Sequence, residues 1–198
     1  MKKAYMIEDI AILPQAVKNL RYQLYLDAPD TSRWEHVIHN KIGCGTHRAG
    51  EILAGEEPNK KELEKIAEWC GRSSDDVGSA PIYPSDKDGM LKENVRFLLS
   101  CLAHGMNSKL AALLNVKPVQ VSRWKSGKQL PPKKTQADLL RYFALDPGTD
   151  LSGVPLFLAS YPIHAQAQRD WLIRRLQEIS NEDLSPHFQS IRKLISPT

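Results

Sequence analysis

The chain has 198 residues, of which 41% are hydrophobic and 25% charged, and a net charge of +4. These proportions are typical of a globular protein and exclude wholesale disorder. The longest apolar runs are far too short to span a bilayer, and the first residues do not resemble a secretory signal. Three widely spaced cysteines argue against a disulfide framework. We therefore expect a cytoplasmic protein without membrane contact.

The positive charge is concentrated in one part of the chain. Residues 1–80 carry a net charge of −2, whereas residues 81–150 carry +5. Between Asn107 and Lys134 there are seven basic residues and no acidic one. A structured, exclusively cationic stretch is an electrostatic footprint for phosphate, although a solvated basic surface has the same composition.

The spacing of apolar residues predicts an almost entirely helical chain, because they recur at intervals of three and four. Helix-breaking residues are densest in 78–90, which we interpret as a linker. Residues 43–55 match 115–127 in their apolar, glycine and proline positions, with an offset of 72 that becomes 74 further on. This weak internal repeat indicates two copies of one small helical domain.

The first copy, within residues 1–77, contains a string of histidines and a cysteine that suggests zinc: His36, His39, Cys44 and His47. The repeat places Cys44 at a buried turn and His39 beneath the helix packing, with His47 on the outer face. We therefore expect neither a metal site nor another cofactor. The outward residues of this copy are Thr46, His47 and Arg48, a possible second surface for DNA or a protein partner.

The second copy, residues 91–151, has the pattern of two short helices joined by a tight turn. Asn107 can cap a helix that runs to Leu114, and residues 115–117 form the turn. Pro118 suits the first position of the next helix, which Gly127 ends. The side chains expected to face inward are Leu110, Leu113, Leu114, Val121 and Trp124. Such a unit, with a polar outer face on its second helix, fits the major groove of DNA.

These residues resemble a known family. The stretch Val-Ser-Arg-Trp-Lys-Ser-Gly-Lys from Val121 to Lys128, together with Leu110-Ala111 and Leu114-Asn115-Val116, is similar to the Xre type of helix-turn-helix found in lambda-like repressors and Cro. The resemblance is strong over 91–151 and fainter over 14–77. It implies an all-α fold with two such domains in tandem.

The resemblance also implies which residues contact DNA. In the family, the start and outer face of the second helix of the pair touch base edges, and the matching positions here are Lys117, Pro118, Val119, Gln120 and Arg123. Their chemistry agrees, since arginine pairs with guanine, glutamine with adenine, and apolar groups with the thymine methyl. The expected phosphate contacts are Asn107, Lys109, Lys125, Ser126, Lys128, Lys133 and Lys134. The alternative is that Gln120 and Arg123 only solvate a surface helix.

The remaining residues, 152–198, contain two amphipathic segments that predict a helical hairpin. One carries Trp171 and Leu176, and the other carries Leu184 and Phe188. The hairpin can fold back on the second domain or pair with another subunit, and the family analogy favours a homodimer.

Together these observations predict a sequence-specific DNA-binding transcriptional regulator, a dimeric repressor and not an enzyme. No nucleophile constellation or glycine-rich phosphate loop stands out. Two alternatives remain open. One is an antitoxin-like protein or adaptor whose acidic first domain and tail bind a protein partner. The other is a nucleoid protein that binds DNA without sequence preference.

Overall fold

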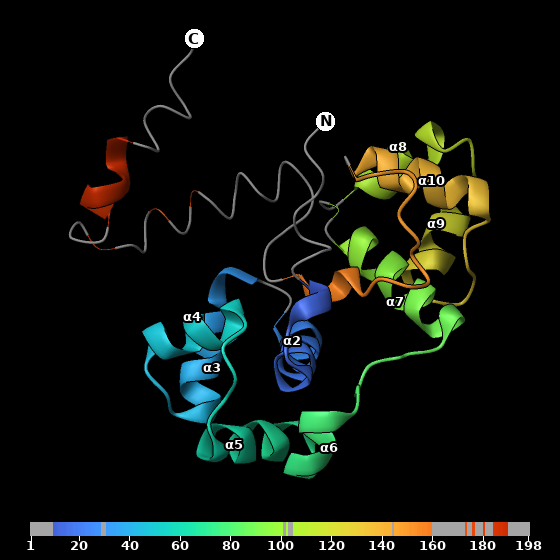
Figure 1. The fold of residues 1–198 in the computed structure, drawn as a ribbon. Coiled ribbons are helices and arrows are strands. Elements are labelled where there is room, and N and C mark those ends of the chain that lie inside the picture. The colour runs from blue at the N-terminus through green and yellow to red at the C-terminus, as the bar shows by residue number, and fades with distance from the viewer. Residues whose placement is uncertain are drawn as a thin grey trace.

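The computed structural model describes residues 10–28, 31–100, 102, 105–143 and 145–159, and beyond them 173, 176, 180 and 184–189. These residues contain helices and no strand, so the predicted all-α class is confirmed for the described part of the chain (Figure 1). Within that part, every helix is too short or too polar to cross a membrane. The α-helices are α2 (Gln15–Asp27), α3 (Trp34–Ile42), α4 (Thr46–Ala54), α5 (Lys60–Cys70), α6 (Ser74–Ser79), α7 (Lys87–Ser100), α8 (Met106–Leu113), α9 (Pro118–Lys125) and α10 (Lys133–Tyr142). The short 3-10 helices are η1 (Thr31–Arg33), η2 (Leu156–Leu158) and η3 (Ser185–His187).

Buried side chains form two separate cores. The first unit, α2 to α6, is built around residues that include Leu20, Trp34, Ile38, Ile52 and Ile66. The second unit, α7 to α10 with η2, is built around residues that include Leu98, Leu110, Trp124, Leu140 and Phe157. The second core therefore continues past the predicted boundary at residue 151, because the three residues of η2 are buried in it.

Each unit contains a pair of internal hydrogen bonds at equivalent positions. The side-chain amide of Asn19, on α2, donates to the carbonyls of Val77 and Ala80 at 2.9 and 2.7 Å. The amide of Asn94, on α7, donates to the carbonyls of Leu151 and Val154 at 2.7 and 2.6 Å. Each bond ties the end of its unit back to the first helix. The repeat therefore also includes the first helices, α2 and α7, which precede the residues that the sequence comparison matched.

The helix pairs α3–α4 and α8–α9 also have the same backbone conformation at the residues that follow each helix. Gly43 and Asn115, which follow the first helix of each pair, have φ angles of +77° and +52°. Gly55 and Gly127, which follow the second helix, have φ angles of +117° and +68°. This left-handed region is open to glycine and, among other residues, best tolerated by asparagine and aspartate.

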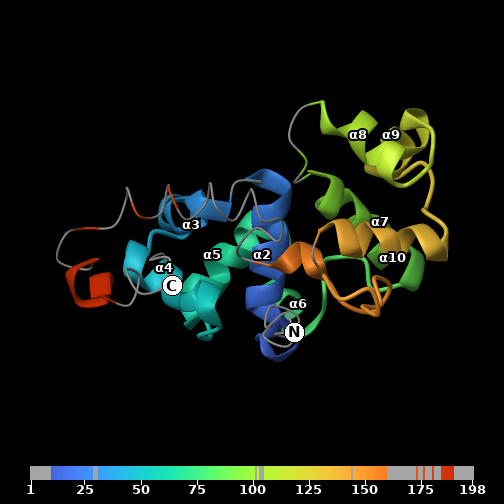
Figure 2. The same cartoon turned by 90° about the horizontal axis from the view of Figure 1, so that it is seen from above.

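Helix α2 is the part of the first unit that faces the second unit in both views (Figures 1 and 2). The ring of Tyr22 packs against Phe157 with centroids 5.4 Å apart, and the ring of Tyr25 packs against Phe97 at 5.8 Å. We call Tyr22, Tyr25, Tyr83, Phe97 and Phe157 the aromatic cluster. Buried Arg21 donates to the carbonyl of Leu53 in the first unit and to that of Leu158 in the second at 3.0 Å. The units are therefore packed together.

The predicted linker, 78–90, is shorter than expected and is not free. Helix α6 extends to Ser79 and α7 begins at Lys87, so only residues 80–86 are irregular. The backbone N–H of Ile82 donates to the Asn19 side chain at 3.0 Å, and Tyr83 belongs to the aromatic cluster. Pro81 and Pro84 lie in this irregular segment, whereas Gly78 lies within α6 and Gly89 within α7, and the segment packs against α2.

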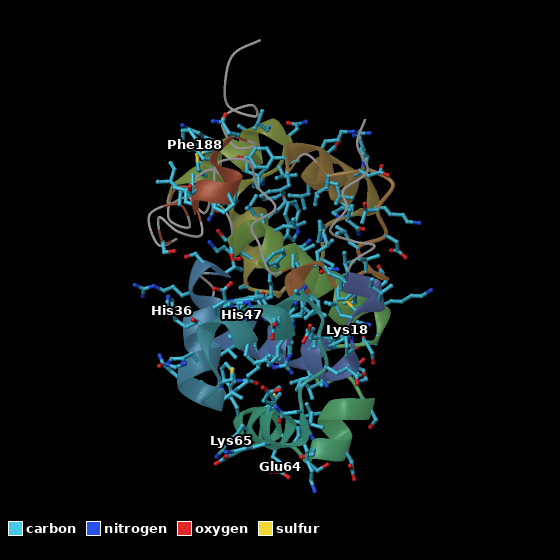
Figure 3. The ribbon with its side chains drawn as sticks, turned by 60° about the vertical axis from the view of Figure 1, so that its left-hand side comes forward. Lys18, His36, His47, Glu64, Lys65 and Phe188 are labelled. Carbon is cyan, nitrogen blue, oxygen red and sulfur yellow. The ribbon has the colours of Figure 1, made fainter. Side chains whose placement is uncertain are left out.

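Most of the predicted C-terminal hairpin, including Trp171, lies outside the described residues. Among those that are described, Ile173, Leu176 and Phe188 are exposed apolar side chains (Figure 3). Residues Ser185–His187 form a single 3-10 turn. The predicted dimerisation through this region therefore stays a prediction.

Candidate nucleic-acid interface

Helix α8 begins one residue before the predicted cap. It starts after Gly105, whose φ is +80°, and no side chain caps it, so the expectation that Asn107 is the cap is wrong. Asn107 lies in the first turn instead. Leu113 is 70% exposed and does not face inward as predicted. The reason is that the buried face of α8 is centred between Leu110 and Ala111, and position 113 lies about 110° around the helix from that centre.

Helix α9 presents the predicted base-reading residues on one side. Pro118 occupies its first turn, and Val121 and Trp124 are buried, as predicted. Among the predicted base-reading residues, the exposed ones are Lys117, Pro118, Val119 and Arg123. After the helix, the N–H of Gly127 donates to the Trp124 carbonyl, and the N–H of Lys128 donates to the Arg123 carbonyl, both at 2.9 Å. This Schellman arrangement fixes where α9 stops.

Gln120 is half-buried and already engaged. Its Oε1 accepts the backbone N–H of Lys117 at 3.0 Å, which stabilises the start of α9. A bidentate contact with adenine needs both the oxygen and the nitrogen of the amide. Gln120 must therefore give up the bond to Lys117 before it can read adenine in the way the sequence predicts.

The cations around α9 are exposed, and the described part of the chain offers them no acidic partner. None of them makes an ion pair within the described residues, whereas Arg48, Lys65, Arg96 and Arg141 all do. We call the following set the basic surface: Lys109, Lys117, Arg123, Lys125, Lys128, Lys133 and Lys134. Ser126 is also exposed, and its hydroxyl donates to the Arg123 carbonyl at 3.1 Å.

One further cation, Lys92 on α7, was missed by the sequence analysis. Its stem lies so close to Gly127 that a Cβ at that position would collide with it. Lys92 is exposed and therefore adds its charge at the end of α9. Sequence reasoning missed it because Lys92 precedes the acid-free stretch, and only the packing of α7 against α9 brings it there.

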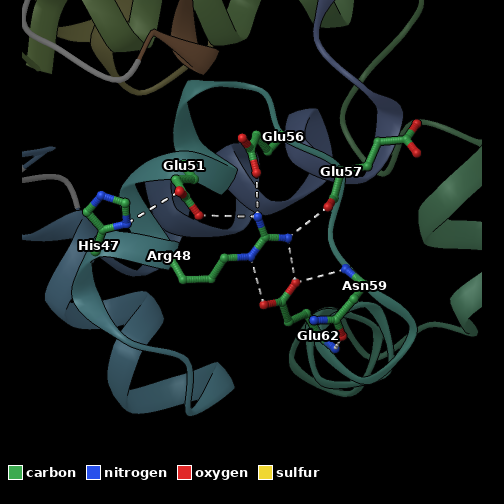
Figure 4. A network of polar contacts seen from close by, with 7 residues as sticks. All are labelled: His47, Arg48, Glu51, Glu56, Glu57, Asn59 and Glu62. Atoms are coloured by element: carbon green, nitrogen blue, oxygen red, sulfur yellow. Dashed lines mark hydrogen bonds and ion pairs between the residues drawn. The ribbon is translucent and has the colours of Figure 1, made fainter.

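The equivalent place in the first unit is occupied by α4, and its chemistry is different (Figure 4). The Arg48 guanidinium donates to both oxygens of Glu62 at 3.0 Å and to Glu56 at 2.6 Å. It also reaches Glu51 at 3.4 Å and the backbone carbonyl of Glu57 at 2.9 Å. We call Arg48, Glu51, Glu56 and Glu62 the Arg48 cluster. The donors of Arg48 are therefore bonded to carboxylates of the same unit.

Glu62 is the organising carboxylate of this cluster. It is buried, and it also completes a capping box with Asn59 at the start of α5, through bonds of 2.8 and 3.0 Å. The hydrogen bonds from Arg48 hold the pKa of Glu62 below its usual value against the opposing effect of burial. Conversely, hydrogen bonds from Glu62 raise the pKa of Arg48. Both groups stay charged and neutralise each other.

Thr46 and His47 still face solvent. The His47 side chain is 90% exposed and its Nδ1 lies 3.4 Å from Glu51 (Figure 4). Of the predicted second surface, two residues are therefore accessible and Arg48 is engaged internally. The sequence analysis considered the acids of the first unit only through the net negative charge of residues 1–80. The i,i+3 spacing of Arg48 and Glu51 was the available signal that acids bind this arginine.

The histidines and cysteine of the first unit do not converge. His39 is exposed, not beneath the helix packing as predicted, and its Nδ1 lies 2.6 Å from the carbonyl oxygen of Cys44. His36 and His47 project from α3 and α4 (Figure 3). Within the described residues there is no group of three side chains placed to hold a metal ion.

Comparisons with protein-family models, curated proteins and solved structures found no match to this chain.

Proposed function

We propose that the chain is a sequence-specific double-stranded DNA-binding regulator of transcription, built from two lambda repressor-like helix-turn-helix domains in tandem. Helix α9 enters the major groove in this proposal. The observation that carries it is the basic surface: exposed cations, without acidic partners among the residues that the structure describes, flank a helix whose outward side chains suit base edges. Phosphate contacts of this kind supply much of the affinity for DNA.

The outward side chains of α9 suit base edges. Arg123 has guanidinium donors for a guanine, and Lys117 adds an ammonium at the start of the helix. Val119 is 51% exposed beside Pro118, so an apolar face lies next to the donors. Contact with a thymine methyl removes that apolar surface from water. Phosphate contacts from Lys125 onwards then hold the helix in register.

The test begins with selection of bound duplexes from a random pool. We expect a preferred sequence, for which Arg123→Ala costs about 1–3 kcal/mol of binding free energy while binding to scrambled duplexes changes little. Arg141→Ala is the matched control, because Arg141 is also an exposed arginine of the second unit but pairs with Asp138 at 2.6 Å. An equal loss on selected and scrambled duplexes contradicts base reading by Arg123.

Repression requires that the selected sequence act inside a promoter. We expect the chain to lower expression of a reporter that carries the selected sequence between its promoter elements, and the Arg123→Ala variant to lose this effect. Competition by random DNA that equals competition by the selected duplex supports a nucleoid protein without sequence preference instead.

A further inference from the structure

We propose that one chain binds one DNA site as a built-in pseudo-dimer with a single reading helix, so that its target sequence has no two-fold symmetry. This inference rests on the proposed DNA binding by α9. It replaces the two-fold operator that the family analogy predicts with an asymmetric one.

The first observation is the packing of equivalent residues against each other. Tyr83 follows the first unit as Phe157 follows the second: Pro81-Ile82-Tyr83 matches Pro155-Leu156-Phe157 in the sequence. The rings of Tyr83 and Phe157 are in contact, with centroids 5.8 Å apart. A residue that touches its own equivalent lies near the axis that relates two copies of a unit. Tyr83 and Phe157 therefore mark where the two copies within this chain meet.

The first helices of the two units belong to the same interface. Asn19-Leu20-Arg21-Tyr22 on α2 matches Asn94-Val95-Arg96-Phe97 on α7. Tyr22 and Phe97 occupy equivalent places in this match, and both belong to the aromatic cluster, where Tyr25 contacts each of them at 6.1 and 5.8 Å. This aromatic surface of each unit is therefore covered by the other unit within one chain.

The pairing within the chain prevents the same surface from pairing two chains. The units are covalently joined by residues 80–86, so their effective concentration for each other far exceeds that of a second chain. Arg21 strengthens the arrangement because it bonds carbonyls of both units and is itself buried. Its counterpart Arg96 pairs locally with Glu93 at 2.7 Å instead. The pseudo-dimer is therefore fixed and asymmetric.

The two helices that the pseudo-symmetry relates, α4 and α9, have opposite chemistry. Arg48 of α4 is bound by the carboxylates of the Arg48 cluster, whereas Arg123 of α9 has no acidic partner in the described residues. Gly55 and Gly127 end the two helices alike, but Glu56 follows the first and Lys128 the second. Only α9 is electrostatically suited to enter a groove. One chain thus offers one reading helix.

The experiment uses the full chain and a pool of random duplexes. We expect a selected motif without two-fold symmetry, bound by one chain per duplex in sedimentation or native mass spectrometry. Arg123→Ala should lower the affinity for this motif by about tenfold or more. The double variant Thr46→Ala/His47→Ala should leave both the affinity and the motif unchanged, because both side chains are exposed on α4 and Arg48 still has Glu56 and Glu62 as partners.

Two outcomes overturn the inference while leaving DNA binding by α9 in place. One is a palindromic motif with half-site centres about 10 base pairs apart that binds two chains. The other is a second block of the motif that disappears in the Thr46→Ala/His47→Ala variant. Failure to select any motif overturns the proposed function itself, and the inference with it.

Discussion

Asn19 and Asn94 hold equivalent positions in the two units, each fully buried and each donating to two backbone carbonyls that lie near the end of its unit. The bonds connect residues about 60 positions apart, so each asparagine closes its unit. A buried carbonyl without a donor is costly, which explains why an amide side chain lies among apolar neighbours.

Replacement of either asparagine by alanine should therefore destabilise the protein. We expect Asn94→Ala to lower the free energy of unfolding by about 2 kcal/mol, and Asn19→Ala by more, since the Asn19 oxygen also accepts the N–H of Ile82. Urea denaturation measures the difference. Gln23→Ala is the control, because Gln23 bonds to exposed Asp27 on the same helix and not to a distant backbone carbonyl among the described residues. A loss no larger than that of the control contradicts the closing role.

Removal of the Phe157 ring should weaken both the second core and the contact between the units. Phe157 is fully buried and touches Tyr22, Tyr25 and Tyr83. Phe157→Ala should cost about 3–5 kcal/mol. In calorimetry we expect the unfolding of the variant to separate into two transitions, one for each unit. Ile12→Ala, at an exposed position, should leave the profile of the original protein.

In the turn between α8 and α9, replacement of Asn115 by alanine and by glycine should have different effects on stability. Asn115 has a φ angle of +52°, where a β-carbon is strained. We expect Asn115→Ala to lower stability by about 1 kcal/mol and Asn115→Gly to leave it nearly unchanged. Equal losses in thermal denaturation would show that the asparagine side chain matters more than the backbone conformation.

The contribution of Glu62 should depend on pH. Because its pKa in the folded protein is depressed, its charge stabilises the fold above the unfolded pKa of about 4.3, and this stability is lost as the pH falls through the folded value. Glu62→Gln should cost about 2 kcal/mol at pH 7. The difference from the original protein should shrink below about pH 4. A difference that is constant from pH 7 to pH 3 contradicts the assignment to charge.

The cations beside α9 should set the salt dependence of DNA binding. Lys128→Gln should lower the slope of log affinity against log salt concentration by about one, equally for all duplexes. We expect the same for Lys92→Gln, which tests the cation that α7 brings to the end of α9. Lys65→Gln is the control, because Lys65 lies in the first unit and pairs with Glu68 at 2.8 Å. An unchanged slope excludes a phosphate contact.

Sequence reasoning succeeded where the signal is local. Trp124 and Val121 are three residues apart and both are buried, and Gly127 ends α9 as its position predicts. It failed where the exposure or the partners of a side chain depend on residues that are distant in the sequence. Leu113 is the same type of residue as buried Leu110 on the same helix. Only the packing of α8 shows that Leu113 faces solvent. The partners of Arg48 lie up to 14 residues away, and their convergence depends on the angle between α4 and α5.

The strongest departure concerns the linker, which composition alone presents as a flexible joint. Pro81 does follow the end of α6, but Gly78 lies inside α6 and Gly89 inside α7, and Ile82 and Tyr83 pack against α2. The breakers therefore do not mark every helix end, and they do not show whether the residues between two helices pack against the protein.

The bond from Arg21 to the carbonyl of Leu158 spans 137 positions of the chain. On the ribosome, α2 is made long before its final neighbours exist, so its arginine and tyrosines stay uncovered while more than a hundred further residues are added. The first unit thus emerges with this face of α2 exposed to solvent, and the face is covered only after η2 has been synthesised. Nascent chains halted before residue 158 should consequently be the form most exposed to chaperones and proteases.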